Sequence, residues 1–448
     1  MQFPKNFIEN IMKADGFDEE QFIKAHDKQP PVSIRLNPIK PTEQFSASKR
    51  IPWCDSGYYL PERPIFTLDP LLHAGVYYVQ EASSMFLEHV LKNVVDLNQS
   101  LKILDLCAAP GGKSTLITSL LNNESILVSN DAIRSRVNVL KENMSKWGYG
   151  NVVITNNDPA DFSKLKNYFD VIVVDAPCSG SGLFRKDKHA MDEWSEENVL
   201  LCSKRQKRIL EDILPALKEN GFLIYATCSY SIEEDELIVK YLIEDFGLRV
   251  ADLEILDDWN IVKNDFGFRF YPDKLDGEGF FLSVLRKVSN TNEKISAEIV
   301  LKERDFAKAD TIKPDNYIRN PEAYEIVANK NFITAYPKNI FTEIQYLYSA
   351  LRVIKAGIYC GEIKGKDFIP SHELALSEII HENIPSIEVD KETAVQYLRK
   401  QEVPFWLLNS TTERGWCLIK YENRNLGWIK ILENRVNNYY PVEWRIRL

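Results

Sequence analysis

The sequence has few cysteines and no long apolar run, and each shortage excludes a class of protein. The seven cysteines among 448 residues are an odd number and form no CxxC pair, which argues against a disulfide framework and a structural zinc site. No run of about 18 apolar residues occurs, as a membrane-spanning helix requires, and the N-terminus lacks the pattern of a signal peptide. We therefore expect a cytoplasmic protein with no membrane association and no bound metal.

Positive charge is also scarce. Against 65 acidic residues there are 55 basic ones, a net charge of −10, and this balance argues against a protein that holds nucleic acid by bulk charge. The acidic excess lies in residues 61–330, whereas 331–448 hold fifteen basic and fourteen acidic residues. The segment Lys420 to Arg447 has six basic and three acidic residues. A local cationic surface near the C-terminus therefore remains open.

The chain does contain short apolar runs that alternate with amphipathic stretches. The runs are Lys102–Cys107, Ser125–Asp131, Val152–Asp158, Asp170–Pro177 and Gly221–Ser229. Helical periodicity separates them, for example over Arg134–Trp147 and Glu196–Lys218. This alternation predicts a doubly wound, parallel α/β sheet. We expect Gly277–Lys287 to close that sheet at its edge.

The length and the changes in composition predict several domains. Residues 1–70 are irregular and rich in Pro and aromatics, which indicates a small α+β module, and 71–288 would form the α/β domain. Residues 289–330 are polar and charged, as in a linker or a surface helix. Residues 331–448 end in aromatic-rich strands and indicate a β-rich domain.

A glycine-containing turn follows the first predicted strand and precedes a helix. It consists of Cys107, Ala108, Ala109, Pro110, Gly111, Gly112 and Lys113. Adjacent glycines let a ligand approach the backbone, and the helix N-terminus offers free amides. The turn matches neither the Walker A spacing nor the GxGxxG fingerprint. Alone, it is a weak indication of a nucleotide-like ligand.

Carboxylates follow the next three strands, at Asp131, Asp158 and Asp175. Because ligands collect at the carboxyl ends of parallel strands, these side chains and the glycine turn should share one rim of the sheet. Three carboxylates favour a ligand with an adenosine moiety and a positive centre over a polyphosphate. The alternative is that each aspartate only caps the following helix.

Two cysteines stand at the ends of adjacent predicted strands, flanked by small polar residues: Cys178 and Cys228. A thiolate in such a place could face a cleft. We expect the other five cysteines to be structural, with Cys107 at most lining the ligand turn. Two thiols without a nearby pair of histidines do not complete a zinc site.

The motifs DLCAAPGGKS, DAPCSGSG and ATCSY, with Asp131 between them, resemble in order and spacing the Nop/Sun family of RNA 5-methylcytosine methyltransferases. The segments IPWCDSGYYL, GVYYVQEASSM and LGWIKILENRVNNYYP look most like the bacterial RsmF-type enzymes of 16S rRNA. The resemblance implies a Rossmann-like methyltransferase core that uses S-adenosyl-L-methionine, followed by a PUA-like C-terminal RNA-binding domain.

The resemblance also implies roles for individual residues. Cys228 would attack carbon 6 of cytosine, Cys178 would assist product release, and Asp175 would contact the base. The turn from Cys107 to Lys113 would line S-adenosylmethionine, with Asp131 at the ribose and Asp158 near the adenine. Arg136, shortly after Asp131, would brace that loop or be an ordinary surface arginine.

The expected partner is structured RNA, either rRNA or the small ribosomal subunit, bound by a monomer. Candidate RNA contacts are Arg185, Lys186, Arg435, Arg445, Arg447, Tyr439 and Tyr440. The two tyrosines could equally form the core of the small domain, and the basic residues could simply be solvated. Two functional alternatives stay open: the same chemistry on tRNA, or a ribosome-assembly factor that binds S-adenosylmethionine without catalysis.

Overall fold

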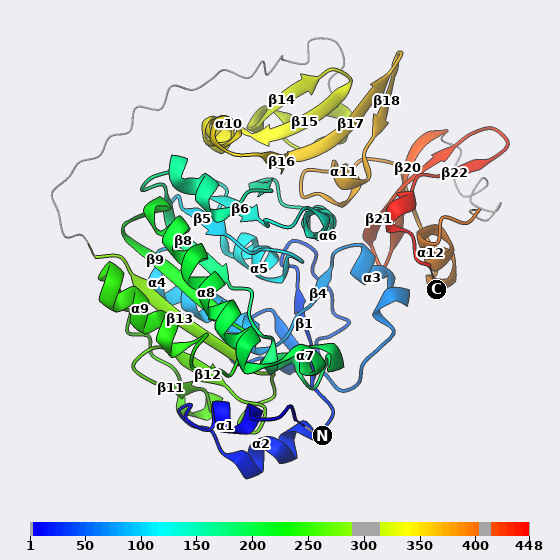
Figure 1. The fold of residues 1–448 in the computed structure, drawn as a ribbon. Helices are drawn as coiled ribbons and strands as arrows, with labels where there is room; N and C mark the ends of the chain where they lie inside the picture. The colour runs from blue at the N-terminus through cyan, green and yellow to red at the C-terminus, as the bar shows by residue number, and fades with distance from the viewer. Residues whose placement is uncertain (1–2, 289–313, 403–413, 448) are drawn as a thin grey trace.

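The computed structural model describes residues 3–288, 314–402 and 414–447, and its centre is a mixed sheet (Figure 1). Five strands of this sheet run parallel: β5 (Lys102–Asp105), β6 (Ile126–Asn130), β7 (Val152–Thr155), β8 (Phe169–Asp175) and β9 (Leu217–Thr227). They lie in the order β9-β8-β5-β6-β7. The strand order therefore reverses between β5 and β8, and a doubly wound sheet binds its ligand at such a switch point.

Antiparallel strands extend both edges of the sheet. Next to β9 lie β13 (Phe280–Arg286), β12 (Phe268–Phe270) and β11 (Val262–Lys263), with β10 (Arg249–Val250) also paired to β13; next to β7 lies β16 (Val353–Ala356). The expectation that Gly277–Lys287 forms the edge of the sheet is wrong, because β13 pairs with β12 on one side and with β9 on the other. Strands as short as β11 and β12 show too little periodicity to be recognised in the sequence.

Helices cover both faces of the sheet, as the alternation of side chains requires. Val171 and Val173 of β8 pack with α4 (Phe86–Val94), α5 (Gly112–Leu120) and α6 (Arg134–Trp147). Ile172 and Val174 face the opposite side, towards α8 (Glu196–Ile213), α9 (Glu236–Phe246) and α10 (Phe341–Ala350). A strand buried on both faces is apolar throughout, which is why the core strands could be predicted.

An N-terminal module packs against this core. It contains α1 (Phe7–Ile11), α2 (Glu19–His26) and a sheet of order β2-β3-β1-β4, formed by β1 (Val32–Leu36), β2 (Lys49–Arg50), β3 (Gly57–Leu60) and β4 (Tyr77–Val79). Because β4 pairs with β1, this sheet extends past residue 70. The buried Arg35 joins the module to the core: its Nη2 donates to Thr115 Oγ1 at 2.6 Å, and its guanidinium lies 4.7 Å from the Trp147 ring centre.

The C-terminal part contains two sheets where one β-rich unit over 331–448 was expected (Figure 1, yellow and red). The first is β14 (Tyr324–Asn329), β15 (Phe332–Pro337), β17 (Ile358–Lys364) and β18 (Asp367–Pro370). The second is β19 (Ser386–Glu388), β20 (Gly415–Tyr421), β21 (Arg424–Ile431) and β22 (Val436–Asn438). Strand β14 begins inside the range expected as a linker, of which residues 289–313 lie outside the described chain.

The remaining α-helices of the described chain are short: α3 (Pro70–His73), α7 (Lys188–Glu193), α11 (His372–Leu376) and α12 (Lys391–Leu398). Helix α11 contacts β17 of the first C-terminal sheet and β21 of the second. It therefore connects the two sheets. Within the described residues, no helix combines the length and apolar character needed to cross a membrane.

Candidate active site

The glycine turn after β5 lines a cavity of about 170 Å³. Gly111 has a φ of 117° and precedes α5, whose first residue is Gly112. That left-handed conformation favours glycine, and it lets the chain pass from the turn directly into the first turn of α5. The cavity is lined by Cys107 to Pro110, Gly112 and Lys113, by Asp105 and Asp175, and by residues 78–81 and 84 of the N-terminal part. The structure thus brings most of the predicted cofactor residues together.

Asp131 and Arg136 hold the backbone of this turn in place. The buried Asp131 carboxylate accepts hydrogen bonds from the amides of Ala109 at 3.3 Å and Ile133 at 2.8 Å. Arg136 lies 3.5 Å from the same carboxylate and donates to the carbonyl of Ala109. The expectation that Arg136 braces this loop is confirmed.

Asp105 is a carboxylate of the site that the sequence reasoning missed. It ends β5 beneath the turn, is fully buried, and lines the cavity. Its Oδ2 accepts a hydrogen bond from Ser114 at 2.7 Å, whereas its Oδ1 has no hydrogen-bond partner in the described chain. Burial raises the pKa of Asp105 to about 7. Asp105 is the first residue of the motif DLCAAPGG, and this position could have identified it from the sequence.

Asp175 ends β8 and pairs with Lys113, whose Nζ lies 2.8 Å from its Oδ2. Burial opposes the charge of Lys113, but the neighbouring Asp175 carboxylate and their hydrogen bond raise its pKa above the usual value. Asp175 remains about one-third exposed on its side chain. The pair therefore places a stable cation and a carboxylate at the open edge of the cavity.

The two cysteines predicted to be chemical lie against each other. The sulfur atoms of Cys178 and Cys228 are 3.1 Å apart, both thiols are free, and both are partly exposed. Cys178 follows β8 and Cys228 follows β9, which are neighbouring parallel strands. The hydrogen bond with Cys228, together with burial, raises the pKa of Cys178 well above its usual value. Cys178 therefore keeps its proton, which it can share with the Cys228 sulfur.

A buried carboxylate, Glu234, ties the two cysteine loops together. It accepts hydrogen bonds from the amide and hydroxyl of Ser179, at 2.8 and 2.5 Å, and from the hydroxyl of Ser229 at 2.7 Å. Gln206 of α8 donates a further one at 3.2 Å. Burial raises the pKa of Glu234, although these hydrogen bonds oppose the change. Sequence reasoning missed this residue, which the acidic run after ATCSY could have signalled.

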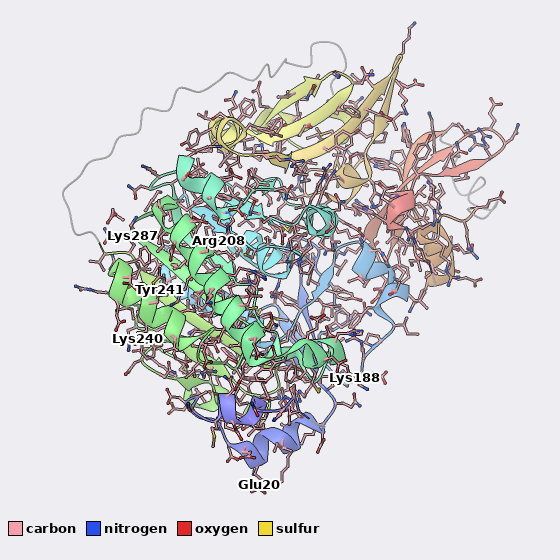
Figure 2. All side chains as sticks on the ribbon, in the orientation of Figure 1. Glu20, Lys188, Arg208, Lys240, Tyr241 and Lys287 are labelled. Atoms are coloured by element: carbon pink, nitrogen blue, oxygen red, sulfur yellow. The ribbon has the colours of Figure 1, made fainter. Side chains whose placement is uncertain are left out.

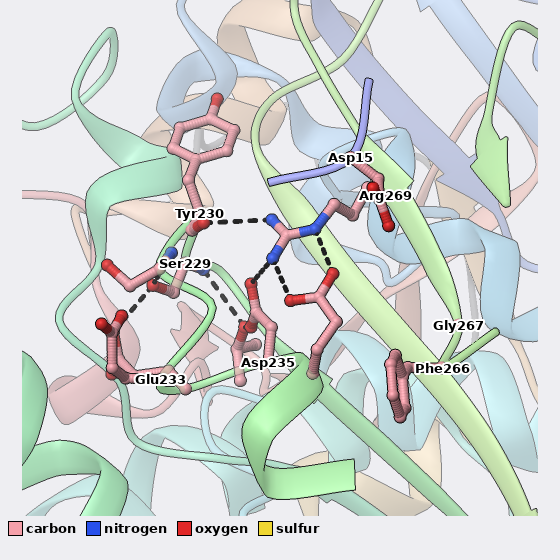
Figure 3. Close-up of polar contacts among 12 residues, drawn as sticks. Asp15, Ser229, Tyr230, Glu233, Asp235, Phe266, Gly267 and Arg269 are labelled. Atoms are coloured by element: carbon pink, nitrogen blue, oxygen red, sulfur yellow. Dashed lines mark hydrogen bonds and ion pairs between the residues drawn. The ribbon is translucent and has the colours of Figure 1, made fainter. Parts of the chain in front are cut away.

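A second buried cluster supports the loop of Cys228 from the other side (Figure 3). The Arg269 guanidinium lies between Asp235, at 3.2 Å, and Glu236, and it also donates to the carbonyl of Tyr230 at 3.1 Å. Asp235 accepts from Thr227 Oγ1 at 2.5 Å. Arg269 therefore holds the chain on both sides of Cys228-Ser229: Thr227 through Asp235, and Tyr230 through its carbonyl.

Asp158 lies apart from the cavity lining. It caps the 3-10 helix Pro159–Lys164, accepting from the amide of Ala160 at 3.2 Å. Its exposed carboxylate is 3.4 Å from Arg208, labelled on α8 in Figure 2. The capping alternative weighed for the strand-end aspartates therefore applies at Asp158, and its contact with adenine stays a prediction.

Arg185 is not available to an RNA phosphate, so its assignment as a surface contact needs correction. Its side chain is 4% exposed and its Nε lies 3.0 Å from Glu278, which is 2% exposed. Because the segment between β12 and β13 brings Glu278 against the loop after β8, Arg185 is turned inward. Lys186 is more exposed and lies 3.8 Å from the same carboxylate.

The C-terminal candidates divide between surface and core. Tyr440 is 1% exposed and packs with His372 and Tyr397, which favours the core alternative. Tyr439 is half-buried against Trp416. The exposed basic side chains are Arg435, Arg445 and Arg447. They keep their predicted role as RNA contacts.

The described residues contain no group of three or more His, Cys, Asp or Glu side chains that could hold a metal ion.

Three family models match successive parts of the chain, and all three describe RsmF or RsmB/F methyltransferases. Residues 3–82 match the N-terminal domain of 16S rRNA methyltransferase RsmF, 92–286 match 16S rRNA methyltransferase RsmB/F, and 384–446 match the methyltransferase RsmF PUA domain. Ribosomal RNA small subunit methyltransferase F of Aliivibrio fischeri is 30% identical over 471 residues, covering 98% of this chain and 97% of the relative. The protein of that name from Vibrio vulnificus is 29% identical over 468 residues, with the same coverage.

Solved structures share about two-thirds of the architecture. A methyltransferase homolog from Pyrococcus horikoshii has a TM-score of 0.54 and 28% identity, covering 64% of this chain and 96% of its own. NSun6 from the same organism, solved with SFG, has a TM-score of 0.54 and 22% identity, covering 64% of this chain and 99% of its own. The matches confirm the resemblance and the fold class predicted from the motifs. The chain belongs to the RsmB/F family of 16S rRNA methyltransferases and, through its N-terminal and PUA domains, to the RsmF type.

Proposed function

We propose that this protein forms 5-methylcytosine in 16S rRNA of the small ribosomal subunit, in the cytoplasm, through a covalent bond between Cys228 and carbon 6 of the target cytosine. The observation that carries the mechanism is the pair of free thiols, with the Cys178 and Cys228 sulfurs 3.1 Å apart. The full-length similarity to small subunit methyltransferase F supports the substrate.

The cavity beside the cysteines suits S-adenosylmethionine, which supplies the methyl group when bound. The unpartnered Oδ1 of the buried Asp105 would face a positively charged group of the cofactor. Cys107 to Lys113 would line the molecule, and Asp131, whose carboxylate also accepts from the amide of Ala109, would hold the ribose hydroxyls. The residues present therefore fit a cationic nucleoside better than a polyphosphate.

Covalent addition is needed because carbon 5 of cytosine is a poor nucleophile. Attack by the Cys228 thiolate on carbon 6 moves the electrons of the ring double bond, so that carbon 5 becomes an enamine carbon that can take a methyl group. Negative charge develops at the N3 edge of the base. Asp175, with the Lys113 ammonium 2.8 Å away, would share a proton there and stabilise that charge.

Release of the product requires that carbon 5 lose its proton to a solvent base. The electron pair left behind re-forms the double bond between carbons 5 and 6, while the bond between Cys228 and carbon 6 breaks and its electrons leave with the sulfur. A departing thiolate is stabilised by a neighbouring proton donor. Cys178 holds its proton and lies in contact with the Cys228 sulfur. Cys178 therefore assists the departure of Cys228 in this scheme.

Transfer of tritiated methyl groups from S-adenosylmethionine to undermethylated 16S rRNA tests the proposal. Cys228→Ala should abolish transfer, because it removes the sulfur that forms the covalent bond with carbon 6. Cys360→Ala, which removes a thiol buried in the C-terminal half, is the matched control and should keep transfer. Transfer by Cys228→Ala would refute the mechanism.

A further inference from the structure

A second cavity, of about 320 Å³, lies where three parts of the chain meet. The loop after β1 lines it together with the segment that follows α11 and the turn between β20 and β21. In Figure 1 these elements lie beside α3, where the C-terminal sheets approach the N-terminal module. None of its lining residues lines the cofactor cavity. It is therefore a separate site.

Cationic side chains dominate this cavity. Those that line it are Lys40, Arg319, Lys420 and Arg424. Lys40 donates to the backbone carbonyls of Ala74 (2.9 Å) and Lys146 (2.5 Å). Arg424 likewise donates to the carbonyl of Pro41. Burial and the neighbouring Arg424 charge lower the pKa of Lys40 to about 7. An anion in the cavity would relieve this repulsion.

Two carboxylates also line the cavity, but they do not neutralise it. Glu378 accepts a hydrogen bond from the amide of Gly150 at 2.9 Å, and burial raises its pKa. Arg319 donates to the backbone carbonyl of Glu378 at 3.1 Å. Glu382 is exposed at the rim. Lys40, with a pKa of about 7, is only partly protonated near neutral pH, but Arg319, Lys420 and Arg424 still outnumber the two carboxylates, so the lining keeps a positive excess.

We propose that this cavity binds a backbone phosphate of the RNA substrate. A phosphate offers several acceptor oxygens to guanidinium and ammonium groups at once, which suits a lining of two arginines and two lysines. The adjoining segment from Lys420 to Arg447 has six basic and three acidic residues, whereas the core is acidic. RNA is favoured over a free anion because the segment that contributes Lys420 and Arg424 holds three further exposed arginines, Arg435, Arg445 and Arg447.

The site would position RNA without taking part in the chemistry. Contacts to phosphates fix the register of a nucleic acid on a protein and contribute affinity that depends on salt. Because the cavity lies between the N-terminal module, the end of α11 and the second C-terminal sheet, a phosphate held there would also stabilise their relative placement. Loss of the contact should therefore raise the KM for RNA and leave kcat unchanged.

The test measures the affinity of the full-length protein for a 16S rRNA fragment by fluorescence anisotropy over a series of salt concentrations. Lys420→Ala combined with Arg424→Ala should raise Kd about tenfold at about 0.15 M salt and lower the slope of log Kd against log salt by about 1 to 2. At saturating RNA, kcat should match the wild type. Lys366→Ala combined with Lys391→Ala removes two exposed charges outside the cavity and should change neither quantity.

Lys420→Arg combined with Arg424→Lys keeps the charges and should keep the slope even if packing at the cavity suffers. Equal slopes for the alanine pair, its control and the wild type would overturn the proposal. So would inorganic phosphate that binds the cavity but leaves the affinity for RNA unchanged at equal ionic strength, since that marks a free-anion site. The identity of the RNA rests on the proposed function: a wild type that binds with this salt dependence but transfers no methyl group would refute that function alone.

Discussion

Replacing Asp105 with asparagine should stabilise the free protein at pH 8 and weaken its binding of S-adenosylmethionine. Asp105 is fully buried, and burial raises its pKa from 3.8 to about 7. At about 1.4 kcal/mol per tenfold change, ionising this carboxylate inside the fold costs roughly 4 kcal/mol. Asparagine keeps the shape and can still accept from Ser114, but it does not ionise.

The sign of the pH dependence follows from this raised pKa. The neutral carboxyl contributes its stability fully below about pH 4, and the contribution is lost as pH rises through about 7. Urea unfolding should therefore show that the advantage of Asp105→Asn over the wild type is larger at pH 8 than at pH 5, by roughly 2–3 kcal/mol. Asp96→Asn, which changes an exposed carboxylate near the other end of β5, is the control.

Replacing Asp105 with asparagine should weaken cofactor binding, although it stabilises the free protein. The ionised Asp105 would pair with a positive group of S-adenosylmethionine, so wild-type affinity measured by calorimetry should rise between pH 6 and pH 8. A lost buried charge interaction of roughly 3 kcal/mol corresponds to about a hundredfold weaker binding for Asp105→Asn, with little pH dependence. Wild-type affinity in this variant, or an equal stability difference at both pH values, would refute the reasoning.

Three further changes test the cysteine loops. Cys178→Ala should permit attack by Cys228 but slow release, so that a protein–RNA adduct resistant to denaturation appears on a gel; normal turnover without adduct would remove Cys178 from the scheme. Glu234→Gln replaces charge-assisted hydrogen bonds by neutral ones, and should cost roughly 2 kcal/mol of stability in urea and lower kcat about 10- to 100-fold at nearly unchanged KM. An unchanged kcat would show that Glu234 does not position the thiols. Arg269→Ala leaves two carboxylates buried without their cation, and thermal unfolding should show a loss of about 3–5 kcal/mol; a smaller loss than for the exposed Arg208→Ala would contradict the role of this cluster.

Much of the fold and of the site could be predicted because their signals are local. The core strands are buried on both faces, so each is a continuous apolar run, and Cys178 and Cys228 stand at the ends of two such runs. Parallel strands bring their carboxyl ends to one rim. The order of the motifs therefore predicted which side chains meet, although not that the sulfurs are 3.1 Å apart.

Other features depend on segments that are distant in the sequence. Arg185 is buried because Glu278, 93 residues later, folds back against it, and β16 completes the core sheet from the C-terminal half. The cation-lined cavity exists only where Lys40 meets Arg424. The sequence by itself determined the core strands and the glycine turn, since these follow from local periodicity and spacing, and it placed Cys178 and Cys228 at the ends of two core strands. Only the tertiary structure decided which charges are buried, paired or exposed, because burial and pairing arise from packing between distant segments.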